Sequence, residues 1–392
     1  MGSILIKGVR VDGRPRNVLI EDKRFKSLDA ADGAEAQTVI DGRGKALLPG
    51  LYNTHTHSAM TLLRGLGDDK PLEEWLQHYV WPYEAGLGPE DLRRGYTLGM
   101  REMASTGTTF FNDMYFGLEE AVDAVRASGL RASIGLPVIG GHPHSMRPDQ
   151  FTFLKEWRDP TGGRIQLTVA PHSVYTVDRE DWITLARIAR DYGLRIHTHL
   201  SETRTEVANC VREHGMRPVA YLDSLGVLGP DVILAHCVHI TPEEADLLAE
   251  RRVTISHCPC SNMKLGSGIF PYELLTKAGC RITIGTDGAS SSNNLDVREA
   301  MKFAALLAKV GGNPELLPAA QVFEWATVQA AEAFGIDGGV IAEGKLADAI
   351  LVDLENVKMQ PCHNLLSNFV YSADSTCIAG VVCDGEIIYQ QL

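Results

Sequence analysis

The sequence predicts an α/β protein: a (β/α)8 barrel of the TIM type with a small β-sandwich domain that both ends of the chain build together. Three observations predict this fold. Strand-like runs alternate with helical stretches eight times between residues 50 and 344. Residues 1–49 and 345–392 instead contain short strands broken by turns. Neither end has enough strands to bury a sheet face by itself, so we expect the two ends to pair into one composite β domain.

Length and charge narrow the class of protein. The 392 residues are 44% hydrophobic and 22% charged, which is typical of a globular chain. The net charge of −13 and the lack of a basic run argue against nucleic acid or an anionic membrane as a partner. No apolar run reaches the roughly 18 residues of a membrane helix. The eight cysteines form no Cys-x-x-Cys pair, which favours reduced thiols and a cytoplasmic location.

The expected strands are short and bounded by turn residues. In the terminal segments they cover Ile4–Val11, Asn17–Glu21, Thr38–Asp41, Ala349–Val352, Ile378–Cys383 and Glu386–Tyr389. In the barrel they cover Leu51–Thr54, Thr108–Asp113, Arg131–Val138, Ile165–His172, Arg195–Leu200, Val232–His236, Thr254–His257 and Arg281–Asp287. Asp384-Gly385 is typical of a tight turn between the last two strands.

Helix boundary signals separate the barrel strands. Thr241, followed by Pro242 and then by Glu244 at the third helical position, is typical of a helix start. Three glycines stand where helices are expected to end, namely Gly129, Gly193 and Gly279. A doubly wound parallel sheet is the alternative fold, but its usual Gly-rich first turn is missing.

Polar side chains end most of the expected barrel strands. The active site of such a barrel lies at the carboxyl ends of its strands. His55 and His57 alternate on the first strand, so both imidazoles point the same way. With His199 and Asp287 they give three histidines and one aspartate, a set that leaves room for water, as in a catalytic zinc site. The alternative is polar residues at strand–loop junctions, with Asp287 as a turn former.

Further residues at these strand ends refine the prediction. Glu202 follows His199 by three residues and is expected to face a water in the site and move its proton, unless it is only a charge favoured at a helix N-terminus. His197 is expected to be a hydrogen-bonded core residue. His172 stands where two-metal hydrolases of this fold carry a bridging lysine, so one metal is expected. His257–Cys260 fits no usual zinc spacing and is interpreted as a loop rather than a second metal site.

At this point the chain resembles a known family. The segments that carry the resemblance are Leu48–His57, His197–Thr203, Ala235–His239, Ser256–Gly266 and Gly285–Ala289. They are similar to the amidohydrolase superfamily, and within it to the branch of 5-methylthioadenosine/S-adenosylhomocysteine deaminases and chlorohydrolases. The likeness extends over nearly the whole chain, including both terminal β segments.

The resemblance implies a metal site and a set of catalytic roles. One divalent metal ion, usually zinc with Fe²⁺ or Mn²⁺ as alternatives, is expected on His55, His57, His199 and Asp287. Glu202 is expected to move protons to the purine ring nitrogen. His236 is expected to hydrogen-bond the attacking hydroxide, and Asp287 to orient it and hold its proton.

The resemblance also implies substrate contacts. Glu84 and His172 are expected to touch the nucleoside, and Glu202 and Asp287 to face its base. The segment that carries Glu84 follows the first barrel strand, so its carboxylate can accept hydrogen bonds from both ribose hydroxyls. Trp75, Trp81 and Tyr83 are expected to cover the substrate with apolar surface. The alternative for Glu84 is a solvated loop charge.

The sequence also bears on whether the enzyme recognises a substrate that carries an amino-acid carboxylate. Relatives in this branch hold such a carboxylate with arginines in the stretch after the third barrel strand. Leu136 occupies one of the aligned positions, and Arg147 is the candidate for the other. Without the first arginine, S-adenosylhomocysteine fits less well than adenosine, 5'-deoxyadenosine or methylthioadenosine.

The predicted function is therefore hydrolytic deamination of an adenine nucleoside, which releases ammonia and an inosine-type product. One alternative is an aminohydrolase or chlorohydrolase acting on another heteroaromatic ring, such as guanine, a pterin or a triazine. Another is a barrel that has lost catalysis, which the intact ligand set disfavours. We expect a small-molecule substrate, no nucleic-acid or membrane partner, and a homo-oligomer.

Overall fold

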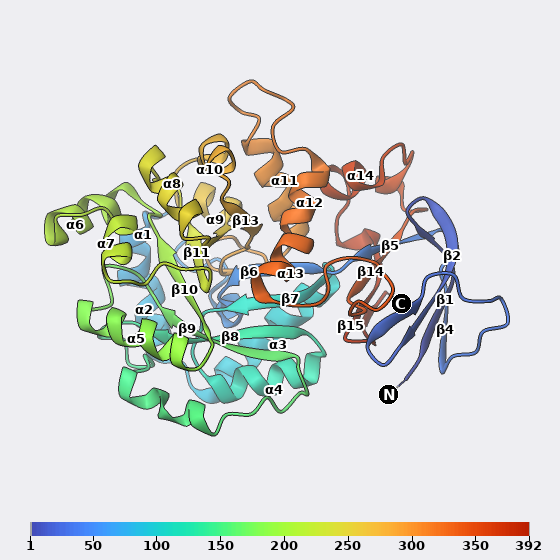
Figure 1. Cartoon of the computed structure of the whole chain (residues 1–392), viewed down its shortest axis with the longest axis horizontal. Helices are drawn as coiled ribbons and strands as arrows, with labels where there is room; N and C mark the ends of the chain where they lie inside the picture. Colours follow the sequence, from blue (N-terminus) through green and yellow to red (C-terminus); the bar gives the residue numbers. More distant parts are fainter. Residues whose placement is uncertain (1, 392) are drawn as a thin grey trace.

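The computed structural model describes residues 2–391 and shows a barrel beside a separate β-sheet (Figure 1). Eight parallel strands follow one another round the barrel in chain order, which confirms the predicted fold class. Their bounds are β6 Leu51–Thr56, β7 Thr108–Asp113, β8 Arg131–Val138, β9 Ile165–Pro171, β10 Arg195–Leu200, β11 Val232–His236, β12 Thr254–His257 and β13 Arg281–Ile284. The segment after β13 meets β6, because the backbone N–H of Asp287 donates to the carbonyl of His55 at 3.0 Å.

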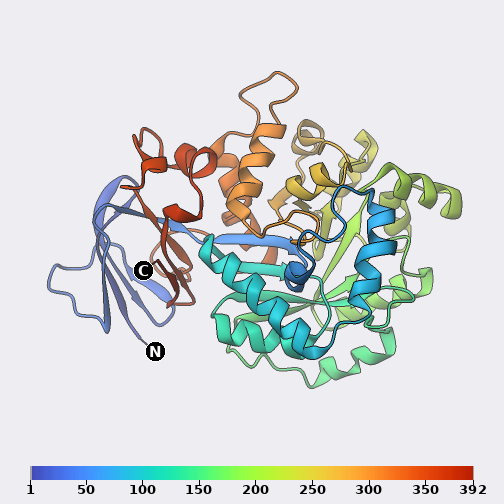
Figure 2. The same ribbon diagram turned by 180° about the vertical axis from the view of Figure 1, so that it is seen from behind.

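Helices lie around the outside of the barrel, as the two opposite views show (Figure 1, Figure 2). The helices that follow the first barrel strands are η1 Ser58–Leu63, α1 Leu72–Trp75, η2 Leu76–Val80, α2 Trp81–Glu84, α3 Pro89–Ser105, α4 Leu118–Ser128, η3 Pro148–Lys155 and α5 Arg179–Asp191. The later ones are α6 Arg204–His214, α7 Pro218–Ser224, α8 Pro242–Glu250, α9 Pro259–Lys264, α10 Tyr272–Ala278, α11 Val297–Leu307, α12 Ala319–Trp325 and α13 Val328–Phe334. No helix within residues 2–391 combines the length and apolar character that a membrane span requires.

The residues predicted to begin and end helices form the hydrogen bonds and backbone conformations of helix caps. Thr241 and Glu244 satisfy each other's backbone N–H groups at the start of α8, as a capping box does. Gly129 and Gly279 end α4 and α10 with φ of 77° and 83°, a conformation that favours glycine.

Both ends of the chain build the separate sheet. Its strands are β1 Ile4–Val11, β2 Arg14–Glu21, β3 Arg24–Ser27, β4 Thr38–Asp41, β5 Lys45–Pro49, β14 Ala349–Asp353, β15 Ile378–Cys383 and β16 Glu386–Gln390. The two ends join where β5 runs antiparallel to β14, with Leu47 opposite Leu351. The sheet buries a small core to which both ends contribute, for example Val9 and Val382. The remaining helices near this sheet are η4 Val357–Met359, α14 Leu365–Tyr371 and η5 Ser375–Cys377.

The chain passes from this sheet to the barrel at Gly50, between the end of β5 and the start of β6. The division into a composite β domain, residues 1–49 and 345–392, and a barrel domain, residues 50–344, stays a prediction, which this change of sheet supports. A buried ionic cluster connects the two parts. Arg131 of β8 lies 3.3 Å from the carboxylate of Asp348 and 2.9 Å from that of Asp384, and all three side chains are buried.

Three barrel strands differ in extent from the prediction. β6 continues to Thr56, so His55 lies on the strand itself, and β9 ends at Pro171, one residue before His172. The expected end of the last strand at Asp287 is wrong, since β13 ends at Ile284. The backbone of Gly285 approaches His55 so closely that a Cβ there would lie 2.8 Å from the His55 Cβ. Asp287 then turns with φ of 64°, which aims its carboxylate back at β6.

Candidate active site

A cavity of about 630 Å³ opens at the carboxyl ends of the barrel strands. Part of the lining, here called the apolar wall, includes Trp75 and Trp81 from the segment after β6, together with Phe116 and Ile139 from the next two βα loops. The lining also contains the polar residues that the sequence singled out, namely His57, Glu84, His172, His199, Glu202, His236 and Asp287.

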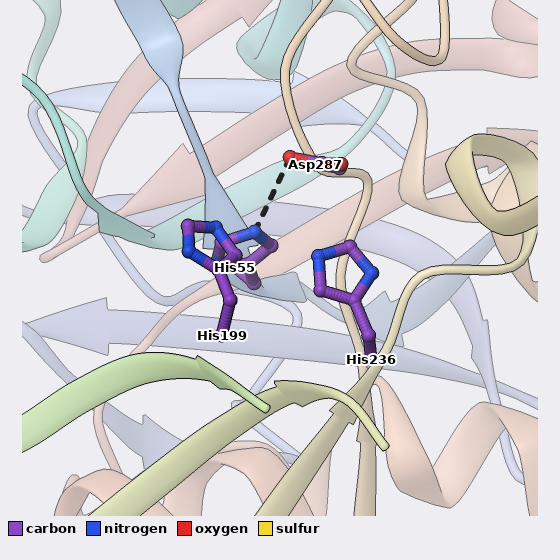
Figure 3. Close-up of side chains that lie close together, drawn as sticks. All are labelled: His55, His199, His236 and Asp287. Atoms are coloured by element: carbon purple, nitrogen blue, oxygen red, sulfur yellow. Dashed lines mark ion pairs between the residues drawn. The ribbon is translucent and has the colours of Figure 1, made fainter. Parts of the chain in front are cut away.

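Histidines and one aspartate converge at the floor of this cavity. His55, His199, His236 and Asp287 offer ligand atoms that all lie within 4.8 Å of one another (Figure 3). His57 belongs to the same cluster, because its Nε2 lies 3.2 Å from Asp287 Oδ1 and 3.3 Å from His199 Nε2. The structure therefore brings together the four predicted metal ligands and adds His236 beside them.

Hydrogen bonds behind the cluster orient the rings. The Nδ1 atoms of His57 and His199 donate to the backbone carbonyls of Met114 and His172 at 2.6 and 2.8 Å. The Nδ1 atom of His236 lies 2.8 Å from Asn262 Oδ1. Each of these bonds turns Nε2 toward the cluster, which is how histidine ligands are held around metal ions.

His55 is held in a different way. Its Nδ1 lies 2.8 Å from Nε2 of His197, which is buried one layer deeper, as the sequence predicts for a core histidine. Its Nε2 lies 3.2 Å from Asp287 Oδ1 (Figure 3) and has no hydrogen-bond partner among residues 2–391. A fully buried imidazole nitrogen without a partner fits a site built for a cation.

The charges in the cluster also favour a bound cation. Burial lowers the pKa of His55 to about 4. Burial also opposes charge on His57, but hydrogen bonding and attraction to Asp287 outweigh it and raise the pKa of His57 to about 9. Despite its own burial, the pKa of Asp287 lies well below its ordinary value because of these two histidines. The cluster is most stable with a positive charge at its centre, which a divalent cation supplies.

Glu202 and its neighbours face this cluster. Glu202 is buried, and its carboxylate accepts a hydrogen bond from Ser267 Oγ at 3.1 Å and lies 3.6 Å from His236 Nε2. Burial raises the pKa of Glu202 above its ordinary value, which suits a group that must both take and give a proton. Asp287 is held by the hydroxyls of Ser261 and Ser291 at 2.6 and 3.0 Å.

Most of the expected substrate contacts line the cavity, but not all of them do. Glu84 and His172 line the cavity, and Glu84 is only 3% exposed, so the alternative of a solvated loop charge is wrong. Burial, and then the charge of His57, lowers the pKa of His172 to about 3, so this imidazole stays neutral. Trp75 and Trp81 line the cavity as expected, but Tyr83 is 40% exposed and does not.

The structure does not bring Arg147 to the cavity. Its side chain is 68% exposed and pairs with Asp149 at the start of η3. Leu136 is buried within β8 and does not line the cavity. Among residues 2–391, no lysine or arginine lines the cavity at all. His257 is also outside the cluster, with its ring stacked on Phe270 at 4.1 Å.

The sequence did not predict several residues that support the site. Glu206 binds the backbone next to Glu202, and His142 lies beside Glu84. Ser261 and Asn262 follow β12 and meet Asp287 and His236. Nothing in the spacing of His142, Ser261 and Asn262 signals their roles, because each acts on a residue that follows or ends a different strand. Glu206 follows Thr203 by three residues, a capping-box spacing that predicts a carboxylate reaching back to the backbone before α6.

A (β/α)8 barrel with a histidine–aspartate cluster and a buried glutamate at the carboxyl ends of its strands defines a metal-dependent hydrolase. The chain belongs to the amidohydrolase family, whose sequence profile matches residues 46–388. It is 45% identical to a 5'-deoxyadenosine deaminase of Methanothermobacter thermautotrophicus, over 98% of this chain and 93% of that protein.

Two further relatives support this membership. A 5-methylthioadenosine/S-adenosylhomocysteine deaminase of Syntrophomonas wolfei is 40% identical over 95% of this chain and 88% of its own. The crystal structure of an adenosine deaminase from Xanthomonas campestris, with bound zinc, is 36% identical. It superposes with a TM-score of 0.92 over 98% of this chain and 92% of that chain. This chain is accordingly an enzyme of the deaminase type within its family.

Proposed function

We propose that this enzyme is a zinc-dependent hydrolytic deaminase of adenine nucleosides with a neutral group at the 5' position, such as 5'-deoxyadenosine, methylthioadenosine and adenosine. The observation that carries the proposal is the position of Glu202, buried between Ser267 and His236 at the edge of the histidine–aspartate cluster. The names of the relatives support an adenine nucleoside as substrate.

We infer that one zinc ion is held by His55, His57, His199 and Asp287. When bound, zinc lowers the pKa of a coordinated water toward neutrality. The neutral His199 and His55 present nitrogen, and the ionised Asp287 presents oxygen, which is a donor set that zinc accepts. His236 remains free to orient the nucleophile through its Nε2.

Proton movement falls to the side chains around the cluster. Glu202 takes a proton from water through its carboxylate and delivers it to the ring nitrogen, which makes the adjacent ring carbon electrophilic. Water adds its oxygen to that carbon, and the amino group leaves as ammonia. Asp287 takes the second proton of the attacking oxygen and returns it to the amino group, which supplies the third hydrogen of the ammonia. The orientation of Asp287 is fixed by Ser261 and Ser291.

Glu84 and the apolar wall select the rest of the substrate. In this proposal, the Glu84 carboxylate accepts hydrogen bonds from both ribose hydroxyls, and His172 contacts the nucleoside beside it. The wall offers no cation among the described residues, so a substrate carboxylate would be desolvated there without a partner. Arg147 is therefore not proposed as a substrate contact. The cytoplasmic location and the homo-oligomeric state expected from the sequence stay predictions.

Ammonia release from a substrate panel tests the proposal. The panel contains 5'-deoxyadenosine, methylthioadenosine, adenosine, S-adenosylhomocysteine, guanine, a pterin and an aminotriazine. We expect turnover of the three neutral nucleosides. The kcat/KM for S-adenosylhomocysteine should be at least about tenfold lower, because its unpaired carboxylate would cost about 1.5–3 kcal/mol in the cavity. Turnover confined to guanine, pterin or triazine would overturn the proposal in favour of another heteroaromatic substrate.

A further inference from the structure

Two histidines in the loop between β8 and η3 have no part in the chemistry described above. His142 is almost completely buried, with 4% of its side chain exposed. Its ring stacks on the ring of Phe116 with a centroid separation of 4.4 Å and an angle of 3° between the planes. His144 follows two residues later and lies tilted against both rings. Burial and stacking leave His142 one fixed orientation.

The hydrogen bonds of the loop place the proton of His142. The backbone N–H of His144 donates to Nδ1 of His142 at 3.3 Å, so that nitrogen presents a lone pair. In the neutral ring the proton is then on Nε2. This Nε2 lies 3.5 Å from Oε2 of Glu84 and has no hydrogen-bond partner among residues 2–391. The N–H of His142 is therefore aimed at the Glu84 carboxylate.

The same loop also contacts the backbone of Glu84. Nε2 of His144 lies 3.1 Å from the Glu84 carbonyl oxygen. His142 thus faces the carboxylate of Glu84 and His144 contacts its carbonyl, although the loop follows Glu84 by about 60 positions in the sequence. Glu84 lines the cavity and His142 does not. His142 consequently stands behind Glu84, on the side away from the substrate.

A buried carboxylate is unstable without donors, and no lysine or arginine lines this part of the cavity among the described residues. A donor from behind approaches the carboxylate from the side away from the substrate, while Tyr115, which lines the cavity, is another side chain close to this carboxylate. Hydrogen bonds that are long in the absence of substrate commonly shorten when it binds. The 3.5 Å separation between His142 and Glu84 is of this kind.

We propose that His142 is a positioning residue that holds the Glu84 carboxylate toward the two ribose hydroxyls and so sets the preference of the enzyme for ribonucleosides. The inference rests on the proposed function, since it needs an adenine nucleoside in the cavity. It concerns affinity for the sugar and not the chemical step, which takes place at Glu202 and the histidine–aspartate cluster.

The test compares adenosine with 2',3'-dideoxyadenosine, which differ only in the two hydroxyls. For His142→Ala, we expect KM for adenosine to rise roughly tenfold, as loss of a hydrogen bond to a charged group implies, with kcat within a few-fold of wild type. KM for the dideoxy compound should stay unchanged. His142→Gln, which keeps an N–H donor near the same place, should recover most of the loss. His78→Ala, an exposed histidine of η2, is the matched control and should leave both substrates unaffected.

A double-mutant cycle with Glu84→Ala identifies the route of the effect. If His142 acts through Glu84, then adding His142→Ala to Glu84→Ala should change KM for adenosine no further. Additive effects, or equal losses on both nucleosides, would overturn the inference while leaving the proposed function intact. If wild type deaminates no adenine nucleoside, 5'-deoxyadenosine and methylthioadenosine included, the proposed function itself fails. Circular dichroism and zinc content check that each variant is folded. If His142→Ala does not fold, the comparison is made with His142→Gln.

Discussion

Glu206 accepts the backbone N–H of Glu202 with one carboxylate oxygen, at 2.7 Å, and the N–H of Ser201 with the other, also at 2.7 Å. Ser201 has φ of 51°, in the left-handed region that residues other than glycine rarely adopt. The Glu206 carboxylate therefore stabilises the turn after β10. This turn aims the Glu202 side chain into the cavity.

Replacing Glu206 with glutamine should reduce kcat. The amide offers one acceptor and turns its NH₂ group toward a backbone donor, so one of the two bonds is lost. Loss of a hydrogen bond to a charged group costs about 1.5–3 kcal/mol, which corresponds to roughly a tenfold to hundredfold drop if it displaces Glu202. Steady-state kinetics on 5'-deoxyadenosine, with zinc content measured in parallel, checks this. An unchanged kcat would show that the turn holds its shape without Glu206.

Glu206 should also make stability depend on pH. Burial raises the pKa of Glu206 to about 7 from an ordinary value of 4.5. Between these pH values the folded protein binds this proton and the unfolded chain has released it. The free energy of unfolding should therefore fall as pH rises, by about 3 kcal/mol in total at 1.36 kcal/mol per pKa unit. Urea denaturation at pH 4.5 and pH 8 measures the fall, and Glu206→Gln should show a fall smaller by that amount.

His197 should control metal affinity without touching the metal. It is fully buried and holds His55 through a 2.8 Å hydrogen bond. His197→Ala leaves the His55 ring without this support, and loss of such a partner typically weakens metal binding about 10- to 100-fold. Competition with a chelator measures the change. His257→Ala removes an equally buried histidine that is stacked on Phe270, and its zinc affinity should match wild type.

The contact between the terminal sheet and the barrel should depend on Arg131. Arg131→Met removes the cation that Asp348 and Asp384 share. Asp348 is then buried without a positive partner, while Asp384 keeps Lys23 at 2.7 Å. Breaking a buried ionic cluster in this way costs about 3–5 kcal/mol of unfolding free energy. Urea denaturation should show that loss. Arg24→Ala breaks a half-exposed pair with Asp337 and should have little effect, which separates burial from the mere presence of an ion pair.

The sequence was sufficient to predict the barrel and the floor of its site. Parallel strands place their carboxyl ends at one edge, so the histidines after or on each strand must meet there. His55 and His57 share a direction because side chains alternate on a strand. Glu202 was predicted instead from its place three residues after His199, at the very end of the strand. Each of these inferences needs only local spacing and the closure of the barrel.

Other features depended on contacts that local spacing does not encode. The strand Lys45–Pro49 was missed because its partner, β14, lies some 300 residues further along the chain. His142 gains its role from a carboxylate in another loop, which leaves no periodic signal. Arg147 was assigned to the site by alignment, yet η3 holds it at the surface beside Asp149.

The most direct test of the account compares wild type with Glu202→Gln on 5'-deoxyadenosine, both loaded with zinc. Ammonia release and bound zinc are measured on the same samples. The account predicts that wild type deaminates the nucleoside. It predicts that the variant keeps one zinc per chain while kcat falls about 10²- to 10⁴-fold, because Glu202 moves protons and does not bind the metal. A variant that retains wild-type turnover, or one that loses its zinc, would contradict the role assigned to Glu202.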